Sequence, residues 1–291
     1  SADGVVFDGL TVTPPNASTD AGAEALRVSG AADNITVRNN GVRDFGAAGL
    51  PEWEGVDAIN VFGGNADDVV RNVIVADNLI ENVSGRSTKG GVTGISVQGN
   101  VENADVSDNV VRNVGESDTA WAFGAVVRGT GNHDVVPSEI SIAQNNISNI
   151  RSNPETRTVG VGIGVEAGGA PAVTFENNSV SDAAFLVEDK TATINLSAFA
   201  GNNELDRGAI LQPVEIDGQD RNIVLNSVQD ALNLASENET VKLVPGIYAE
   251  NASVETPNVT LVGQGDDTVI DGCVAVDADE TTLSQVRIRV S

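Results

Sequence analysis

The sequence predicts an all-β protein: a right-handed parallel β-helix with an asparagine ladder and one short capping α-helix. Three observations predict this fold. A segment recurs five times without gaps, each copy reads as two short strands around a polar pair, and one position of the repeat is always Asn. The composition agrees with strands, because the 40% of hydrophobic residues are mostly Val, Ala and Ile, while aromatic residues make up 3%.

The repeats start 31 to 38 residues apart, and each begins with alternating apolar residues, the period of a strand with one buried face. A further short strand precedes each copy, for example AINV at Ala58 and GISV at Gly94. One turn of the coil therefore contains three strands. The five copies are ITVRNNGVRDF from Ile35, VIVADNLIENV from Val73, ADVSDNVVRNV from Ala104, ISIAQNNISNI from Ile140 and VTFENNSVSDA from Val173.

The sixth position of the repeat predicts a structural ladder. Stacked Asn side chains can pair their amides from one turn of the coil to the next, which satisfies polar groups that are costly to bury. Asn also tolerates the left-handed backbone of a tight corner. The predicted ladder residues are Asn40, Asn78, Asn109, Asn145 and Asn178.

The charge balance restricts the partners. The chain has 42 Asp and Glu against 16 Lys and Arg, a formal net charge of -26. This charge argues against nucleic acid and acidic membranes as partners, and no long apolar run predicts membrane insertion. Lysine occurs only at Lys89, Lys190 and Lys242, and this scarcity together with the acidic excess resembles proteins of extremely halophilic archaea.

The last quarter of the chain predicts a helix followed by new strands. SVQDALNLA from Ser227 has apolar residues at helical spacing and capping residues at its start, and TVKLVPGIYAENASV, NVTLVGQGDDTVIDG and CVAVDADETTLSQVRIRV follow. This succession resembles the opening of pectate-lyase-like β-helices, including pectin methylesterases, in which a short helix covers the open core before the first strands. The resemblance covers about 65 residues and, with the Asn-bearing repeats, implies the fold rather than the reaction.

The order of these parts suggests a permuted coil. We expect β-helix turns in residues 1–200, a connecting segment in 201–222, and a capping helix with opening strands in 223–291. The last part folds beneath residue 5 of the same chain, continues the coil of a neighbouring molecule, or belongs to a longer tandem array. The second arrangement predicts head-to-tail self-association.

Two sets of surface residues suggest contact with or attachment of glycans. Trp53 and Trp121 fall in equivalent loops and either stack on sugar rings or anchor their loops on the coil. Nine N-x-S/T sequons favour an exported, glycosylated protein of the cell surface or exterior. They are Asn16, Asn34, Asn82, Asn146, Asn177, Asn195, Asn238, Asn251 and Asn258.

No catalytic motif stands out in the sequence. His133 is the single histidine and lies in a loop, and the single Cys273 excludes an intrachain disulfide. Asp77 and Asp108 occupy equivalent positions on successive turns and suggest at most a weak calcium site, so no cofactor is expected.

The sequence therefore favours a noncatalytic structural protein, a surface adhesin or filament subunit. The alternative is a polysaccharide lyase, esterase or hydrolase that acts in a groove covered by loops. Acidic residues and an arginine from three consecutive turns that converge in one cleft would favour the enzyme.

Overall fold

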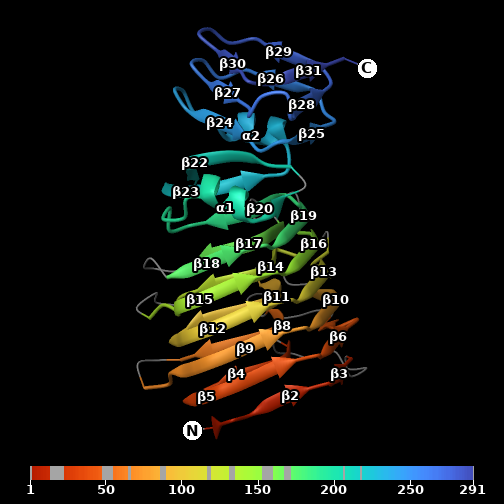
Figure 1. Ribbon diagram of the computed structural model, residues 1–291, viewed down its shortest axis with the longest axis vertical. Coiled ribbons are helices and arrows are strands. Elements are labelled where there is room, and N and C mark those ends of the chain that lie inside the picture. Colours follow the sequence, from red (N-terminus) through yellow and green to blue (C-terminus); the bar gives the residue numbers. More distant parts are fainter. Residues whose placement is uncertain are drawn as a thin grey trace.

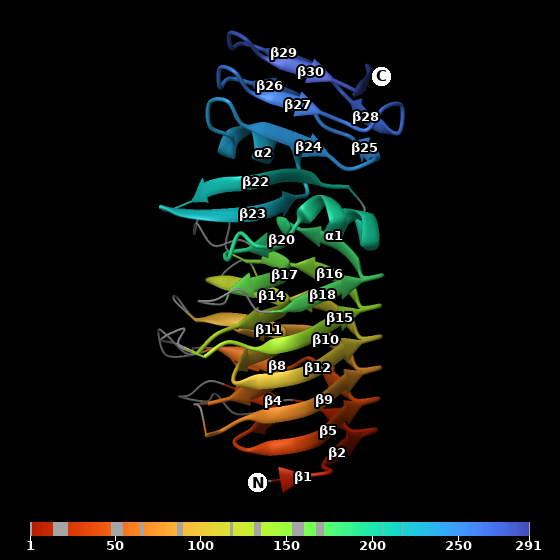
Figure 2. The same ribbon diagram turned by 60° about the vertical axis from the view of Figure 1, so that its left-hand side comes forward.

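The computed structural model describes residues 2–13, 23–47, 55–64, 67–85, 90–116, 119–130, 135–152, 160–166, 172–205, 207–216 and 218–290. Within these ranges the chain has 31 strands and two helices. Strands follow one another around a single long axis, in chain order from the N-terminal end to the C-terminal end (Figures 1 and 2). The predicted parallel β-helix is confirmed.

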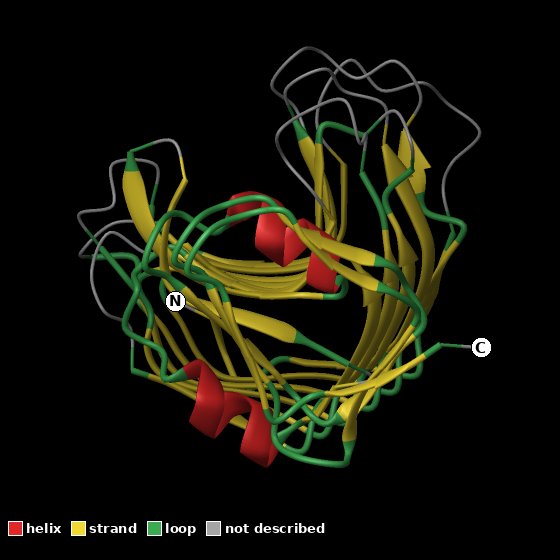
Figure 3. Ribbon diagram, turned by 90° about the horizontal axis from the view of Figure 1, so that it is seen from above, coloured by secondary structure: helices red, strands yellow, loops and turns green. Residues whose placement is uncertain are grey.

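Three sheets of parallel strands form the first coil, here called sheets A, B and C, and they enclose its core (Figure 3). Sheet A contains β1 (Ala2–Asp3), β2 (Val6–Asp8), β5 (Ala32–Arg38), β9 (Val70–Ala76), β12 (Val101–Ser107), β15 (Ser138–Ala143) and β18 (Val173–Glu176). Sheet B contains β3 (Thr11–Val12), β6 (Gly41–Arg43), β7 (Gly46–Ala47), β10 (Leu79–Gly85), β13 (Val110–Val114), β16 (Asn146–Ile150), β19 (Ser179–Ala183) and β21 (Glu204–Leu205).

Sheet C is the longest sheet and continues through the whole molecule. In the first coil it contains β4 (Ala23–Ser29), β8 (Val56–Gly63), β11 (Gly91–Gly99), β14 (Trp121–Arg128), β17 (Gly160–Glu166) and β20 (Phe185–Asp189). An antiparallel hairpin, β22 (Ala209–Ile216) and β23 (Gln219–Leu225), then leads to β24 (Thr240–Leu243), β27 (Thr260–Val262) and β30 (Thr282–Ser284).

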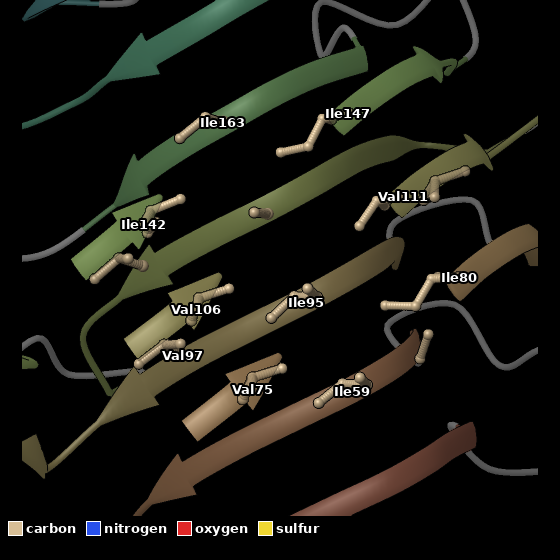
Figure 4. Packing of buried hydrophobic residues seen from close by; sticks show 14 of the residues in the cluster. Ile59, Val75, Ile80, Ile95, Val97, Val106, Val111, Ile142, Ile147 and Ile163 are labelled. Carbon is tan, nitrogen blue, oxygen red and sulfur yellow. The ribbon is translucent and has the colours of Figure 1, made fainter. Parts of the chain in front are cut away.

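Equivalent apolar side chains stack in columns in the core of the first coil. Ile59 lies in register with Ile95, and Val75 lies in register with Val106 (Figure 4). Each of these four side chains is at most 1% exposed. Small β-branched residues fit this arrangement because they pack well on a pleated surface, which explains the predominance of Val and Ile.

The asparagine ladder is confirmed and has one more member than expected. The amide of Asn109 donates to Oδ1 of Asn145 at 2.9 Å and Oδ1 of Asn109 accepts from Asn78, and all five predicted residues are at most 2% exposed. Asn178 in turn donates to Asn203 at 2.8 Å. The left-handed residue of each corner precedes the ladder Asn and does not coincide with it, as at Asp77 and Asp108.

The first coil ends at helix α1 (Leu196–Asn202), which the sequence analysis missed. Asn195 caps its first turn by accepting from the amide of Ala198 at 3.1 Å, and Leu196 and Phe199 are buried in the core of the first coil. The helix follows β20 of sheet C and precedes β21 of sheet B, and it contacts β18. It therefore takes the place of a strand of sheet A and covers the last edge of that sheet.

A second, shorter coil begins at helix α2 (Val228–Leu234), which the sequence predicted. Ser227 caps the helix, and Val228, Ala231 and Leu232 are buried in a separate core cluster. Besides the strands of sheet C, this coil contains a sheet of β25 (Gly246–Tyr248), β28 (Thr268–Asp271) and β31 (Arg287–Arg289), and a pair of β26 (Ala252–Val254) and β29 (Val274–Val276).

The placement of the second coil corrects the suggested order of the parts. Residues 223–290 lie beyond the last turn of the first coil, at the end opposite Val5 (Figure 1). Residues 209–216 and 218–222 form most of the hairpin between the coils and do not return along the first coil. The chain therefore does not fold its last part beneath residue 5. The helix α2 opens a new coil in chain order, as the resemblance implied for such a helix.

Candidate functional site

The outer face of sheet C carries polar side chains from four consecutive turns. Strand β8 shows how they are presented: Ala58 and Ile59 both point into the core, so Asp57 and Asn60 on either side of them both point outward. The position of Ala58 is Gly94 in the next strand, where an added Cβ would lie 2.5 Å from the side chain of Val111. The same Cβ would lie 2.5 Å from the backbone oxygen of Gly124, so a side chain larger than a hydrogen atom does not fit at Gly94 without a shift of its neighbours.

Two carboxylates on neighbouring strands share one amide group. Glu24 of β4 lies in register with Asp57 of β8. The side-chain amide of Asn60 donates to Glu24 Oε1 at 2.7 Å and approaches Asp57 Oδ2 at 3.4 Å. Arg27 forms an ion pair with Glu24 at 2.7 Å. Glu24 therefore has two close donors, one of them charged, whereas the shared amide lies farther from Asp57.

Arg128 reaches this pair from two strands away. Its guanidinium lies 3.5 Å from Asp57 Oδ1 and donates to the hydroxyl of Ser96 at 3.2 Å. The same guanidinium lies over the ring of Trp121, 5.6 Å from its centroid. Acidic residues of the first two turns, a hydroxyl of the third and an arginine of the fourth thus meet on one face. The acids and the arginine span four turns rather than the three consecutive turns of the enzyme criterion.

The two carboxyl groups have different environments. Burial raises the pKa of Asp57, and the positive charge of Arg128 opposes this only in part. Its side chain is 18% exposed. In many enzymes two carboxyl groups lie side by side and one of them is buried. Burial favours the neutral form of that group, which can then act as the proton donor.

Two buried polar atoms beside the pair have no hydrogen-bond partner: Oδ1 of Asn60 and Nε of Arg128. Asn60 is 4% exposed, and the neighbouring Thr93, whose hydroxyl interacts with Asp57, is fully buried. Buried polar groups are nearly always paired, so two unpaired atoms beside two carboxyl groups call for an explanation. Hydroxyl groups of a bound molecule, or ordered water, would satisfy them.

The next turns make the same face apolar. Thr93 lies in register with Phe123, and Phe123 in turn with Val161. Phe123, Val126 and Val161 form a small buried cluster on the outside of sheet C, against which Trp121 packs with its ring edge-on to Phe123. The polar cluster therefore borders a buried apolar cluster, with the half-buried Trp121 beside it.

Ion pairs occupy the upper end of the face, near the hairpin. Burial raises the pKa of Glu188, and Arg221 pairs with Glu188 at 2.7 Å. Lys190 joins Glu188 to Glu166. These charges are matched within the chain, so we interpret this group as a clamp between the last strand of the first coil and the hairpin.

The sequence analysis did not identify the Glu24 and Asp57 pair, because the strand predicted at Ala58 begins one residue after Asp57. The signal was present, since AEALRV and VDAINV place an acidic residue at the same position of consecutive copies. Asp77 and Asp108, which were considered instead, lie exposed at left-handed corners. The nearby Arg112 pairs with Glu81 at 2.6 Å.

Trp121 lies elsewhere than expected. It is the first residue of β14 rather than part of a loop, and its ring covers the backbone of Gly91 so closely that an added Cβ there would lie 2.0 Å from it. These contacts agree with the alternative in which Trp121 anchors its segment on the coil. The ring is half-buried beside Arg128, and its contact with a glycan stays a prediction. Trp53 and His133 lie outside the described residues.

Eight of the nine sequons fall on described residues. Seven of these Asn residues are exposed and Asn258 is half-buried, while Asn16 lies outside the described ranges. The amides of Asn34 and Asn82 already donate to Asp3 and Asp44, at 2.9 and 2.8 Å. A glycan on either nitrogen would replace one of its hydrogens and compete with these bonds. The sequons outside such pairs, for example Asn146, have no such conflict.

The described residues contain no candidate metal site and no candidate membrane span. No group of three or more His, Cys, Asp or Glu in that part of the chain is arranged to hold a metal ion. No helix there has the length and apolar character needed to cross a membrane. Comparison with protein families, with curated proteins and with solved structures finds no match for this chain.

Proposed function

We propose that the chain binds a polysaccharide on the outer face of sheet C and cleaves a glycosidic bond there, with Asp57 as proton donor. The observation that carries this proposal is the Glu24 and Asp57 pair, bridged by Asn60 and with two unpaired buried polar atoms beside it. Hydroxyl-rich ligands suit such a surface, because they both donate and accept hydrogen bonds.

The roles follow from the two environments. Asp57, whose neutral form is favoured by burial, protonates the leaving oxygen, and the more exposed Glu24 acts as the base or nucleophile. Arg128 stabilises Asp57 once it is ionised. Trp121, half-buried beside Arg128, is the aromatic residue that borders this site.

Two further features support a saccharide as the ligand. The opening of the second coil resembles pectate-lyase-like enzymes, many of which act on polysaccharides, although their calcium-binding acids are not reproduced among the described residues. The exposed sequons favour an exported protein, which would meet polysaccharides outside the cell. We therefore place the chain at the cell surface or exterior.

The experiment is incubation with a panel of neutral and uronate-containing polysaccharides in molar salt, with new reducing ends as the readout. Asp57→Asn should lower the rate by about 10²–10⁴-fold, the usual contribution of a general acid. Asp105→Asn is the matched control, because Asp105 is an exposed acid on sheet A.

The products distinguish the reactions. Hydrolysis yields saturated ends, whereas a lyase yields an unsaturated sugar that absorbs ultraviolet light. Binding without cleavage, weakened by Trp121→Ala, would indicate a noncatalytic adhesin that uses the same face. Equal activity of the Asp57→Asn and Asp105→Asn variants would rule out the assigned role of Asp57.

A further inference from the structure

Sheet C changes its buried face at the hairpin. Val187 of β20 and Val224 of β23 lie in register and pack in the core of the first coil. Ala209 of β22 and Leu243 of β24 lie in register and pack in the core of the second coil, and so does Ile223, the neighbour of Val224. Because successive residues of a strand point to opposite faces, the two cores lie on opposite faces of one continuous sheet.

One face of β24 and β27 is therefore turned toward the side on which the first coil has its core. Val241 and Leu243 pack in the second core, so Lys242 between them points to the other face. Ile210 and Val262 lie in register with Lys242 on either side. Helix α1, at the end of the first coil, contacts β22 beside this face (Figure 2). The helix and the strands form two walls of a cleft.

The walls of this cleft are mainly apolar. Its volume is about 530 Å³, which lies within the size range of small-molecule sites. Helix α1 contributes Ser197, Ala200 and Gly201, and the other lining residues belong to β22, β24 and β27 or directly follow the last two of these strands. Six of the eleven lining residues are apolar: Ala200, Ile210, Leu243, Val244, Pro245 and Val262. The cleft therefore suits a small ligand with an apolar body.

The charge of the cleft is opposite to that of the whole chain. None of the eleven lining residues is acidic, although the chain has 42 Asp and Glu, and the charged residue among them is Lys242. In the described part of the chain Lys242 forms no ion pair, whereas Lys190 contacts Glu166 and Glu188. An ammonium group without an acidic neighbour attracts an anion more strongly than one that is already neutralised by carboxylates.

We propose that this cleft binds a small organic anion, whose carboxylate pairs with Lys242 and whose apolar body lies between α1 and the strands. The side-chain amide of Gln264, which also lines the cleft, offers a second polar contact to the carboxylate. The inference is independent of the proposed saccharide chemistry, because Glu24 and Asp57 lie on strands of the first coil.

Octanoate is the probe, because it joins one carboxylate to a short apolar chain. Calorimetric titration of the 291-residue chain in about 1 M potassium chloride should show saturable binding at one site. This salt screens the repulsion between the anion and the net charge of -26, because the screening length falls to about 3 Å. Octan-1-ol, which has the same chain length and no charge, should bind about tenfold more weakly. The proposal is overturned if octanoate shows no saturable binding below its micelle-forming concentration, or if octan-1-ol binds equally well.

A matched pair of charge variants tests the role of Lys242. Lys242→Gln should lower the affinity for octanoate about tenfold, because a hydrogen bond between charged groups is lost, and should leave the binding of octan-1-ol unchanged. Arg287→Gln removes the same charge from an exposed residue of β31 that does not line the cleft, and should change neither affinity. Equal losses of octanoate affinity in the two variants would show that net charge alone governs binding and would overturn the proposal.

Substitutions at Gly201 test the location of the site. A Cβ added at Gly201, on the wall formed by α1, meets no atom within 4 Å, so a side chain fits there without a clash. Gly201→Ala adds one methyl group and should leave the affinity for octanoate within about twofold, whereas Gly201→Phe fills part of the cleft and should lower it about tenfold or more. Circular dichroism should show the same fold for both variants. Unchanged octanoate binding by Gly201→Phe would place the site elsewhere and contradict the proposal.

Discussion

Asn178 and Asn203 are hydrogen-bonded, amide nitrogen to amide oxygen, at 2.8 Å, although β19, β20 and α1 lie between them in the chain. Asn203 also donates to the carbonyl of Phe199 at 2.8 Å, in the last turns of α1. One side chain thus ends the helix and extends the ladder by a sixth member. The ladder therefore continues where a helix replaces a strand of sheet A, although Asn202, the residue before Asn203, is helical rather than left-handed.

We predict that the ladder contributes strongly to stability. Asn109→Ala leaves the amide groups of Asn78 and the carbonyl of Val75 without their partners in the core, at a cost of about 3 kcal/mol in the free energy of unfolding. Urea unfolding followed by circular dichroism measures this cost.

Asn113→Gly is the matched control for the ladder. Asn113 pairs with Asn82 in an exposed row of side chains and has a left-handed backbone, which glycine tolerates. We expect a change within roughly 0.5 kcal/mol, as is usual for surface substitutions. Similar costs at both positions would show that the burial of the ladder is unimportant.

We predict that the single tyrosine titrates far above its usual range. The side chain of Tyr248 is buried, and its hydroxyl donates to the carbonyl of Gly208 or of Val244. Burial raises the pKa of this hydroxyl to about 12. Because the chain has one Tyr, ultraviolet absorbance reports this group alone. The folded chain should titrate near 12 and the chain in denaturant near 10.

The tyrosine also links stability to alkaline pH. A pKa raised on folding means that the folded chain holds its proton where the unfolded chain loses it, so stability falls as pH rises above about 10. Tyr248→Phe should remove this dependence and cost about 1–3 kcal/mol at neutral pH, because the buried amide of Gly208 loses its acceptor. A native titration near 10 would contradict the burial of this hydroxyl.

We predict that Asp57 lowers stability at neutral pH. Burial raises its pKa above the unfolded value near 3.8, so the folded chain binds the additional proton, and the free energy of unfolding decreases as pH rises through the folded pKa. Asparagine resembles the neutral carboxyl group. The melting temperature of Asp57→Asn minus that of the original chain should therefore be larger at about pH 7 than at about pH 4. Thermal melts at both pH values, with Asp105→Asn for comparison, measure this. A variant that is less stable at pH 7 would indicate that the carboxylate stabilises the fold.

We predict that α1 is held by its buried aromatic residue. Phe199 is 3% exposed and packs edge-on against Phe175, so Phe199→Ala should cost about 3–5 kcal/mol. Ser197→Ala, on the exposed side of the same helix, should change stability by no more than about 0.5 kcal/mol. Hydrogen exchange at β18 should increase in the first variant only, because α1 covers the edge of that strand. Equal protection of β18 in both variants would contradict this covering role.

The seam between the two coils shows where sequence reasoning reached its limit. SVQDALNLA predicted α2 correctly, because its caps and apolar spacing are local. The antiparallel hairpin that joins the coils has no such periodic signal, and the opening motif after 200 residues of coil was therefore taken as a permutation. Which strand edge accepts the hairpin depends on contacts between residues such as Val187 and Val224, which only the folded chain brings together.

By itself, the sequence determined the repeat, the parallel coil and the five predicted ladder residues, because strand alternation and the fixed place of Asn in each copy are properties of short segments. Only the tertiary structure decided the sixth ladder residue, the order of the two coils and the polar cluster on sheet C. The contact between Asp57 and Arg128 shows the reason. It joins strands of different turns along a diagonal, and its existence depends on the register of three stacked strands and on the reach of one long side chain.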